Sequence, residues 1–166
     1  MRIGVVSDTH LPRFGRRLPS VLVEGLQGVD RILHLGDLTA PEVLGWLEAI
    51  APVTAIAGNN DPPELHAALG RKRLLTLGGV RIGMVHGDGK GKTTLERALA
   101  AFEDEPLDLL LFGHSHQPYC ARHGDRWVLN PGSPTDKRRM PHYSYALVDL
   151  APGSIVPEVK IFDRRD

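Results

Sequence analysis

Short apolar runs that each stop abruptly at a polar residue are the feature of this sequence that most restricts its fold. Such runs cover residues 2–6, 31–35, 53–57, 80–85 and 108–112, and segments with helical spacing lie between several of them. Strands this uniformly apolar are typical of parallel sheets whose two faces are both covered, with helices on the outside. The sequence therefore predicts an α/β fold in which ligands bind beyond the carboxyl ends of the strands.

The second half of the chain adds a hairpin and several further strands. A Gly78-Gly79 turn between residues 73–77 and 80–85 predicts a β-hairpin. Strand-like segments follow at residues 119–122, 127–129, 143–150 and 155–162. A two-sheet core flanked by helices fits this order, and no repeat or linker divides the chain. We expect one domain over residues 1–166, because one domain commonly takes about 100–200 residues.

The composition is that of a globular protein without a basic excess. Apolar residues make up 42% of the 166 residues, charged residues make up 24%, and the formal net charge is zero. Proteins that bind long nucleic acids usually carry excess positive charge, so nucleic acid is expected only as a possible substrate. The chain opens without a secretory leader, has no apolar run near the ~20 residues of a membrane helix and contains one cysteine, Cys120. We expect a cytoplasmic location and no membrane partner, and a homo-oligomer stays open.

Residues 86–94, HGDGKGKTT, look like a nucleotide-binding loop because they contain Gly91-Lys92-Thr93. A Walker loop requires glycine, four residues and then Gly-Lys-Ser/Thr, and here the first glycine would fall on His86. Such a motif is also expected near the first strand of its fold, whereas this stretch follows a hairpin in mid-chain. We therefore interpret the glycines as an exposed loop, with Lys90 and Lys92 either solvated or leaning over a substrate.

The polar residues at the ends of the predicted strands are of the types that bind transition metals. Imidazole and carboxylate groups suit divalent transition metals, and an amide oxygen can complete the coordination shell. Seven such side chains stand at five strand ends: Asp8, His10, Asp37, Asn59, His86, His114 and His116. Seven ligands are too many for one ion but fit two. The pattern predicts a dinuclear metal site with Asp37 as the natural bridge, since one carboxylate can give an oxygen to each ion.

Several of these residues also have a plain structural interpretation when taken alone. Asp8 could cap a helix, Asn59 could belong to a turn before two prolines, and His86 could be a histidine satisfied at a strand end. His114 and His116 are harder to explain in that way, because two histidines behind a strand and a glycine have little structural purpose. The joint occurrence at five strand ends favours the metal site.

These same residues carry a resemblance to a known family. The calcineurin-like metallophosphoesterase superfamily is similar in order and spacing over residues 1 to about 135, through Asp8-Thr9-His10, Gly36-Asp37, Gly58-Asn59-Asn60-Asp61, His86-Gly87 and Gly113-His114-Ser115-His116. The short chain and Asn130-Pro131-Gly132-Ser133 further resemble its compact prokaryotic phosphodiesterase branch, the YfcE-like group. The resemblance implies a four-layer α/β/β/α sandwich of two mixed β-sheets flanked by helices.

The resemblance also implies how the ligands divide between two metal ions. One ion would be held by Asp8, His10, Asp37 and His116, and the other by Asp37, Asn59, His86 and His114. The expected cofactors are two divalent ions, with Mn²⁺ first and Ni²⁺, Fe²⁺ or Zn²⁺ as alternatives, because mixed nitrogen and oxygen ligands suit Mg²⁺ less well. A hydroxide bridging ions roughly 3.5–4 Å apart would attack phosphorus in line, while the ions neutralise charge on the other oxygens.

Three residues near the ligands are assigned catalytic or supporting roles. Asp61 and His34 are candidates to orient ligands through hydrogen bonds, although simple packing in its strand is favoured for His34. Asn60 stands where many superfamily members carry a histidine that assists the leaving group. Asparagine cannot deliver a proton at neutral pH, so the sequence predicts weak activity on phosphomonoesters with poor leaving groups. The compact branch is associated with phosphodiester substrates.

The expected function is therefore metal-dependent hydrolysis of small phosphodiesters. The alternative is a non-catalytic protein-interaction scaffold on the same fold, which would have no need to keep all seven ligands. Cyclic nucleotides, small linear diesters and nucleic acid ends stay open as substrates. Five arginines could contact the substrate or form a solvated surface: Arg13, Arg16, Arg17, Arg138 and Arg139.

Overall fold

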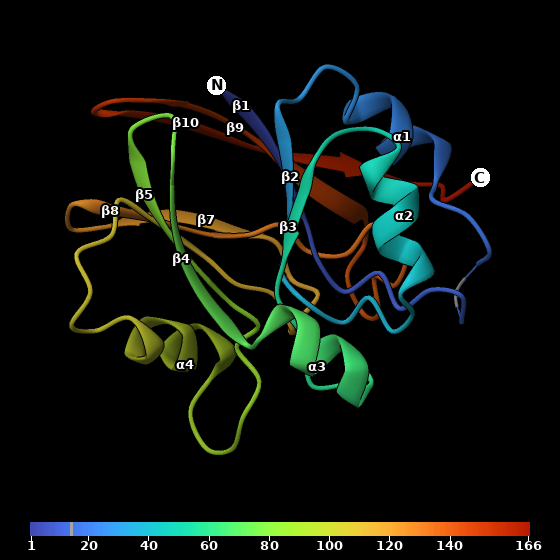
Figure 1. Ribbon diagram of the computed structural model, residues 1–166, viewed down its shortest axis with the longest axis horizontal. Coiled ribbons are helices and arrows are strands. Elements are labelled where there is room, and N and C mark those ends of the chain that lie inside the picture. The colour runs from blue at the N-terminus through green and yellow to red at the C-terminus, as the bar shows by residue number, and fades with distance from the viewer. Residues whose placement is uncertain (14) are drawn as a thin grey trace.

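The computed structural model describes residues 1–13 and 15–166, which form two five-stranded sheets packed between helices (Figure 1). The first sheet has the strand order β10-β9-β1-β2-β3. Its strands are β1 (Arg2–Val6), β2 (Arg31–His34), β3 (Val53–Ala55), β9 (Tyr143–Ala151) and β10 (Ser154–Phe162). β1, β2 and β3 run parallel, whereas β9 is antiparallel to both β1 and β10, so the sheet is mixed.

The second sheet has the strand order β4-β5-β6-β8-β7. Its strands are β4 (Lys72–Leu77), β5 (Val80–Val85), β6 (Leu109–Leu111), β7 (Tyr119–His123) and β8 (Arg126–Asn130). β5, β6 and β8 run parallel, and β4 and β7 are antiparallel edge strands. The pairing of Leu77 with Val80 closes the predicted hairpin around the two glycines.

Four helices complete the layers: α1 (Ser20–Gly25), α2 (Glu42–Glu48), α3 (Pro63–Leu69) and α4 (Thr94–Ala101). α1 and α2 lie outside the first sheet and α4 lies outside the second, which gives the four-layer sandwich that was expected (Figure 1). The sequence did not predict α3, because two adjacent prolines read as part of a turn. Pro63 occupies the first turn of this helix, where a missing N–H is tolerated.

Three apolar clusters correspond to the three interfaces between these layers. Ile3 and Val5 meet Ile82 and Met84 between the sheets, and two further clusters join each sheet to its helices. Side chains along β6 alternate, so that Leu109 and Leu111 face the other sheet while Leu110 faces α4. Both faces of the central strands are thus buried, which explains the uninterrupted apolar runs in the sequence.

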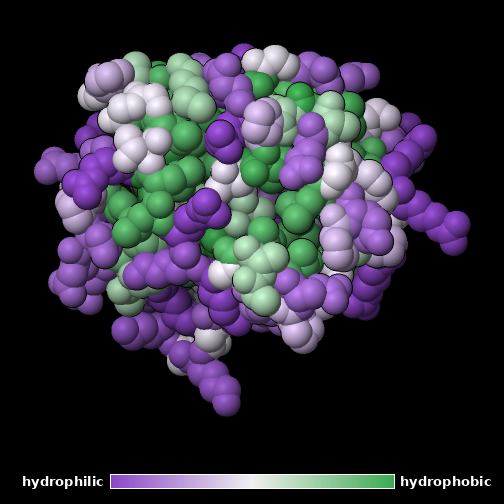
Figure 2. All heavy atoms as spheres, viewed as in Figure 1, coloured by the Kyte–Doolittle hydropathy of each residue, from purple (hydrophilic) through white to green (hydrophobic). Residues whose placement is uncertain are grey.

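One face of the molecule carries hydrophobic residues close to the edge strands β3 and β4 (Figure 2). Leu74 on β4 is 49% exposed there. The tip of the loop before α4 and the C-terminal segment are hydrophilic in the same view. In the part of the chain that the structure describes, no helix is long and apolar enough to cross a membrane.

Candidate metal centre

The carboxyl ends of β1, β2, β5 and β6 bring the predicted ligands together at one end of the sandwich. His86 Nε2 lies 3.6 Å from Asp8 Oδ1 and 3.2 Å from Asp37 Oδ2. His116 Nε2 lies 3.5 Å from the same Asp8 oxygen, and His10 Nε2 lies 3.4 Å from Asp37 Oδ2. Two carboxylates and three imidazoles therefore point their ligand atoms at a common space.

Two groups of ligand atoms within this space could each hold an ion. Asp8, His10 and His116 form one group and Asp8, Asp37 and His86 form the other, with all ligand atoms of a group within 4.8 Å of one another. Asp8 belongs to both groups, and Asp37 also approaches His10, so both carboxylates lie between the groups. The bridging role was predicted for Asp37 alone, and the structure places Asp8 equally centrally.

Histidine pairs flank the two carboxylates. The rings of His10 and His116 have centroids 5.1 Å apart, and those of His86 and His114 are 5.2 Å apart and edge-on. His114 Nδ1 also lies 3.2 Å from Asn59 Oδ1, so the predicted ligands Asn59 and His114 contact each other at the rim of the site. All seven predicted ligands thus lie in one region.

Hydrogen bonds fix which atoms of Asp8 remain available. Its Oδ2 accepts from the Ser7 hydroxyl at 2.7 Å and from the backbone N–H of His114 at 2.9 Å. Its Oδ1 faces His86 and His116 instead. One oxygen of this buried carboxylate is therefore anchored while the other is directed into the site.

The histidine rings are oriented in the same manner. His86 Nδ1 lies 2.6 Å from the Leu35 carbonyl, and His116 Nδ1 lies next to the Asp136 carbonyl. Because a carbonyl can only accept, each Nδ1 carries a hydrogen, and the Nε2 of the neutral ring keeps its lone pair for a ligand. This arrangement is the usual one for metal-binding histidines.

Buried polar atoms without partners test whether a cation fits this space. Among residues 1–13 and 15–166, Asp8 Oδ1, His86 Nε2 and His116 Nε2 are buried and make no hydrogen bond. Leaving such atoms unsatisfied costs about 1–3 kcal/mol each, and a shared cation would satisfy all three. The donor set of carboxylate oxygens and imidazole nitrogens suits a divalent transition metal.

The electrostatics of the metal-free site show how strongly it favours positive charge. Burial alone would raise the pKa of Asp8 and lower that of His86. The surrounding histidines nevertheless lower the pKa of Asp8, and the carboxylates of Asp8 and Asp37 raise the pKa of His86 to about 9. A proton on His86 thus takes part of the place that a metal cation would fill.

Five of the seven predicted ligands have left-handed backbone conformations. The φ angles are +56° at Asp8, +47° at His10, +61° at Asp37, +71° at His114 and +61° at His116. This conformation is uncommon for residues other than glycine and costs of order 1 kcal/mol or more at each position. Such strain persists only where the surrounding structure enforces it, and it concentrates at functional sites.

Glycines beside the ligands allow the loops to approach closely. A Cβ at Gly113 would lie 2.0 Å from Ser7 Oγ, and one at Gly58 would lie 2.3 Å from Asp37 Oδ1. Any larger residue would push the loops of β6 and β3 away from the carboxylates. The glycine before His114 and the glycine before Asn59 are therefore required by packing.

Asp37 is held by the two residues that follow Asn59. Asn60 donates to it twice, through the backbone N–H to Oδ1 at 2.8 Å and through Nδ2 to Oδ2 at 2.9 Å. Asp61 accepts the backbone N–H groups of Asp37, Thr39 and Gly58 at 2.7–2.8 Å. Asp61 is therefore buried below the ligands as an anchor of the loops, and Asn60 contacts the site directly.

His34 is a second anchor below the site. Its Nδ1 accepts the backbone N–H of Gly36 at 3.1 Å, and its Nε2 lies 3.2 Å from Thr9 Oγ1. Burial lowers the pKa of this ring to about 4, so it is neutral and its Nε2 donates to Thr9. Of the two alternatives for His34, the structure places it in a ligand-supporting network and not merely in apolar packing.

Several supporting residues could not be identified from the sequence. Ser133 donates to the Asp8 carbonyl at 2.8 Å, and Thr135 donates to the Thr9 carbonyl. Asn130 donates to the Gly113 carbonyl and to Ser115 Oγ at 3.0–3.1 Å. The turn after β8 therefore braces both the first and the last ligand loops.

The glycine-rich stretch after His86 wraps around an arginine. Arg97 of α4 donates to the Gly87 carbonyl at 2.8 Å, to the Gly91 carbonyl at 3.3 Å and to the Lys92 carbonyl. Thr93 caps α4, since its hydroxyl accepts the Glu96 backbone N–H. The carbonyl groups of this stretch accept hydrogen bonds from the positively charged side chain of Arg97. Its glycines therefore belong to a folded loop and do not form a phosphate-binding site.

The five arginines considered as substrate contacts lie in different places. Arg138 and Arg139 line a hollow of about 530 Å³ with Ser115 and Gln117, beside His116. Arg17 lies 3.7 Å from the Asp166 carboxylate, and Arg16 lines a hollow with the same C-terminal segment. Arg13 is exposed. Of these five arginines, Arg138 and Arg139 share a hollow with residues of the loop that carries His114 and His116.

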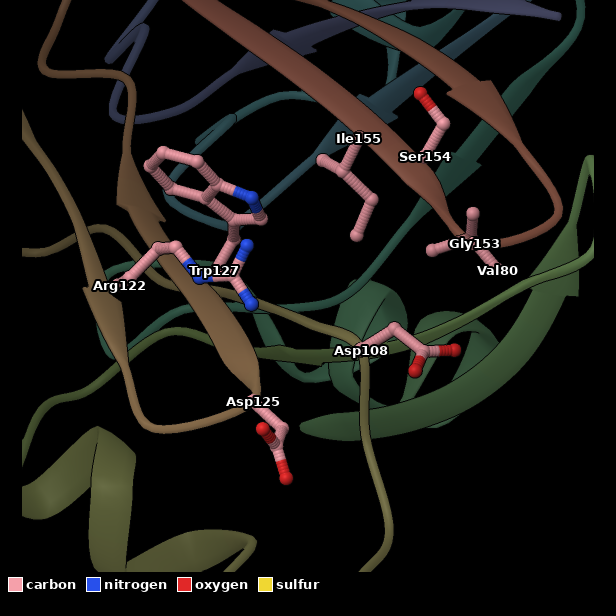
Figure 3. Close-up of a pocket in the computed structure, with 8 residues that line it drawn as sticks. All are labelled: Val80, Asp108, Arg122, Asp125, Trp127, Gly153, Ser154 and Ile155. Atoms are coloured by element: carbon pink, nitrogen blue, oxygen red, sulfur yellow. The ribbon is translucent and has the colours of Figure 1, made fainter.

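A pocket of about 330 Å³ lies at the opposite end of the sandwich (Figure 3). Val80 and Trp127 line it near the amino ends of β5 and β8, whereas His86 follows the carboxyl end of β5. Asp108 and Asp125 lie below the other labelled residues in Figure 3, and Arg122 lies over the Trp127 ring at 5.6 Å. This pocket is separate from the predicted metal ligands.

Comparisons with known proteins agree with the geometry of the site. The family model of the calcineurin-like phosphoesterase superfamily domain matches residues 1–153. A probable metallophosphoesterase of Methanothermobacter thermautotrophicus is 39% identical over 140 residues, which are 83% of this chain and 80% of that protein.

Solved structures share the fold at lower sequence identity. Vps29 of Chaetomium thermophilum superposes with a TM-score of 0.79 at 23% identity, over 98% of this chain and 97% of that chain. An archaeal phosphodiesterase superposes with a TM-score of 0.72 at 23% identity, over 96% of this chain and 100% of that chain. The family match, the metallophosphoesterase relative and the gathered ligands lead to one conclusion: the chain belongs to the calcineurin-like phosphoesterase superfamily.

Proposed function

We propose that this protein is a phosphodiesterase that uses two divalent metal ions, Mn²⁺ first among them, to hydrolyse small phosphodiesters. Asp8, His10, Asp37, Asn59, His86, His114 and His116 would hold the ions, with residues 1–166 acting as one domain. The observation that carries the proposal is the set of buried ligand atoms without partners, Asp8 Oδ1, His86 Nε2 and His116 Nε2. The chain belongs to a phosphoesterase superfamily, and in such an enzyme these ligand atoms would hold the catalytic metal ions.

Two ions are proposed because the ligands fall into two sets around a shared pair of carboxylates. Asp8 joins both groups of ligand atoms, and Asp37 Oδ2 lies within 3.4 Å of one histidine from each group. A pair of ions supplies Lewis-acid activation of water and neutralises charge on a phosphate. The contacts of Ser7, Asn60, Leu35 and Asp136 to the ligands keep these atoms aimed at the space between them.

The diester preference rests on the absence of an acid at Asn60. Its side-chain amide donates to Asp37 Oδ2 and cannot transfer a proton to a leaving oxygen at neutral pH. His34, which lies below the ligands, is buried and bonded to Gly36 and Thr9, so it does not replace the missing acid. Substrates whose leaving groups depart without protonation are therefore favoured.

A protein-interaction scaffold on the same fold is the alternative. The fold shared with Vps29 is compatible with it, because fold alone does not decide function. The strained ligand conformations favour the enzyme, since a scaffold has no use for five left-handed residues that direct carboxylates and histidines at one space. Measurements of metal-dependent ester hydrolysis separate the phosphodiesterase from the scaffold.

The test is hydrolysis of bis-p-nitrophenyl phosphate beside p-nitrophenyl phosphate, on protein stripped by a chelator and then supplied with Mn²⁺, Ni²⁺ or Zn²⁺. Metal-dependent cleavage of the diester with little cleavage of the monoester is expected. A protein that cleaves neither ester with any of the three metals, although it binds them, would overturn the phosphodiesterase and leave the scaffold.

A further inference from the structure

A second hollow, of about 600 Å³, lies between the start of α4 and the segment that carries His114 and His116. Ser115 and Gln117 line it, and these residues flank His116 in the chain. Its volume lies within the range of small-molecule pockets, roughly 300–1,000 Å³. The hollow therefore adjoins the metal ligands and is large enough for one substituent of a substrate.

The walls of this hollow are aromatic and aliphatic. Phe112 and Tyr119 have ring centroids 6.3 Å apart and tilted by 57°, and Leu95 lines the side formed by α4. The Tyr119 hydroxyl pairs with His123 Nε2 at 2.7 Å, which fixes the ring although it is only partly buried. A fixed and partly exposed ring beside apolar neighbours is suited to stacking against a flat ring.

The rim of the hollow is polar and positively charged. Lys92 and Thr93 line it, and both belong to the glycine-rich loop beside α4 (Figure 1). The carbonyl contacts of Arg97 hold this loop in place over the hollow. An aromatic floor with a cationic rim next to a metal centre matches a group that carries a flat ring and lies close to a phosphate.

We propose that this hollow binds the ring of an aromatic substituent of the phosphodiester, such as a nucleoside, with Tyr119 as the specificity-determining residue. The proposal rests on the proposed phosphodiesterase and narrows its substrates to diesters with at least one ring-bearing alcohol. Tyr119 stacks on the ring, and Phe112 and Leu95 exclude water from its other edges. Small alkyl diesters leave the hollow empty and gain nothing from it.

The test compares two diesters that share one leaving group, p-nitrophenolate. The retained alcohol is thymidine in one ester and methanol in the other, so a difference in kcat/KM reports the retained arm. We expect the thymidine ester to be preferred by about 10-fold, which corresponds to about 1.4 kcal/mol, within the range of base stacking on an aromatic ring. Tyr119→Ala should bring the ratio close to one, and the matched control Tyr119→Phe should keep it.

A binding measurement separates this proposal from the phosphodiesterase itself. Thymidine 5′-monophosphate is titrated into metal-stripped protein and followed by NMR shifts of residues 112–119. Binding that weakens about 10-fold in Tyr119→Ala and not in Tyr119→Phe would support the hollow even if neither ester were hydrolysed. Hydrolysis with an unchanged ratio in Tyr119→Ala would overturn the hollow and leave the phosphodiesterase intact.

Discussion

Asn60 donates two hydrogen bonds to Asp37, one from its backbone and one from its side chain, and thereby reaches both oxygens of a single carboxylate. We expect Asn60→Ala to weaken Mn²⁺ binding about 3- to 10-fold, because Asp37 Oδ2 loses a charge-assisted bond while the backbone bond to Oδ1 remains. Calorimetric titration of metal-stripped protein measures the change. An unchanged affinity would mean that Asp37 is held sufficiently by the backbone alone.

Asp61 should matter more for folding than its position beside the site suggests. Asp61→Asn replaces one carboxylate oxygen with an amide NH₂, which then faces either the backbone N–H of Thr39 or those of Asp37 and Gly58. We expect a loss of about 2–4 kcal/mol in the free energy of unfolding, measured with urea on metal-stripped protein. Asp30→Asn is the control, because exposed Asp30 accepts the backbone N–H of Arg2 and should change stability by less than about 1 kcal/mol.

Asp37→Ala tests the shared carboxylate. Asp37 Oδ2 approaches both His10 and His86, so removing this side chain takes a carboxylate from both groups of ligand atoms. We expect diester hydrolysis to fall by more than about 100-fold and fewer than two ions to bind per chain. Metal content after dialysis and the rate of hydrolysis give the two measurements. Full turnover in a folded Asp37→Ala protein would contradict the bridging assignment.

His86 should make the metal-free protein sensitive to alkaline pH. Burial opposes its charge, but Asp8 and Asp37 raise its folded pKa to about 9 from the ordinary histidine value of 6.5. A raised pKa adds stability that is complete below pH 6.5 and is lost as the pH rises through 9, up to about 3 kcal/mol. The urea midpoint of metal-stripped protein should fall over that window, and His86→Gln should remove the fall. Bound metal should remove it as well, because it displaces the proton.

His34 should produce the opposite dependence at acidic pH. Burial lowers its folded pKa to about 4. Between pH 6.5 and 4 the unfolded chain therefore binds a proton at His34 that the folded chain does not bind. Stability should therefore fall by about 3 kcal/mol as the pH drops from 6.5 to 4. His34→Asn keeps an acceptor for Gly36 and has no titrating ring, so its stability should fall less over the same window. Equal slopes for both proteins would contradict the lowered pKa.

The sequence predicted the strand ends well because the central strands are buried on both faces and their apolar runs stop where the polar loops begin. Asp8 follows β1 of the first sheet and His114 follows β6 of the second, so these two positions, 106 residues apart in the chain, meet where the two packed sheets end together. The hairpin at Gly78-Gly79 was equally readable, because a glycine pair between apolar runs has few other uses.

Other parts could not be read from the pattern. α3 was missed because its sequence opens on two prolines, and its seven residues bury only Leu65. The three N–H groups that meet at Asp61 come from two loops, so no local spacing indicates them. The hydrogen bonds from Arg97 to three backbone carbonyls could not be predicted either, because every residue has a backbone carbonyl.

The left-handed ligands bear on how such a chain could change over generations. Glycine adopts that conformation freely, so replacing Asp8, His10, Asp37, His114 or His116 with glycine would relieve backbone strain but would also remove the contacts that the side chain makes. The backbone strain at these five positions is therefore coupled to the side chains, and a substitution that relieves the one removes the other.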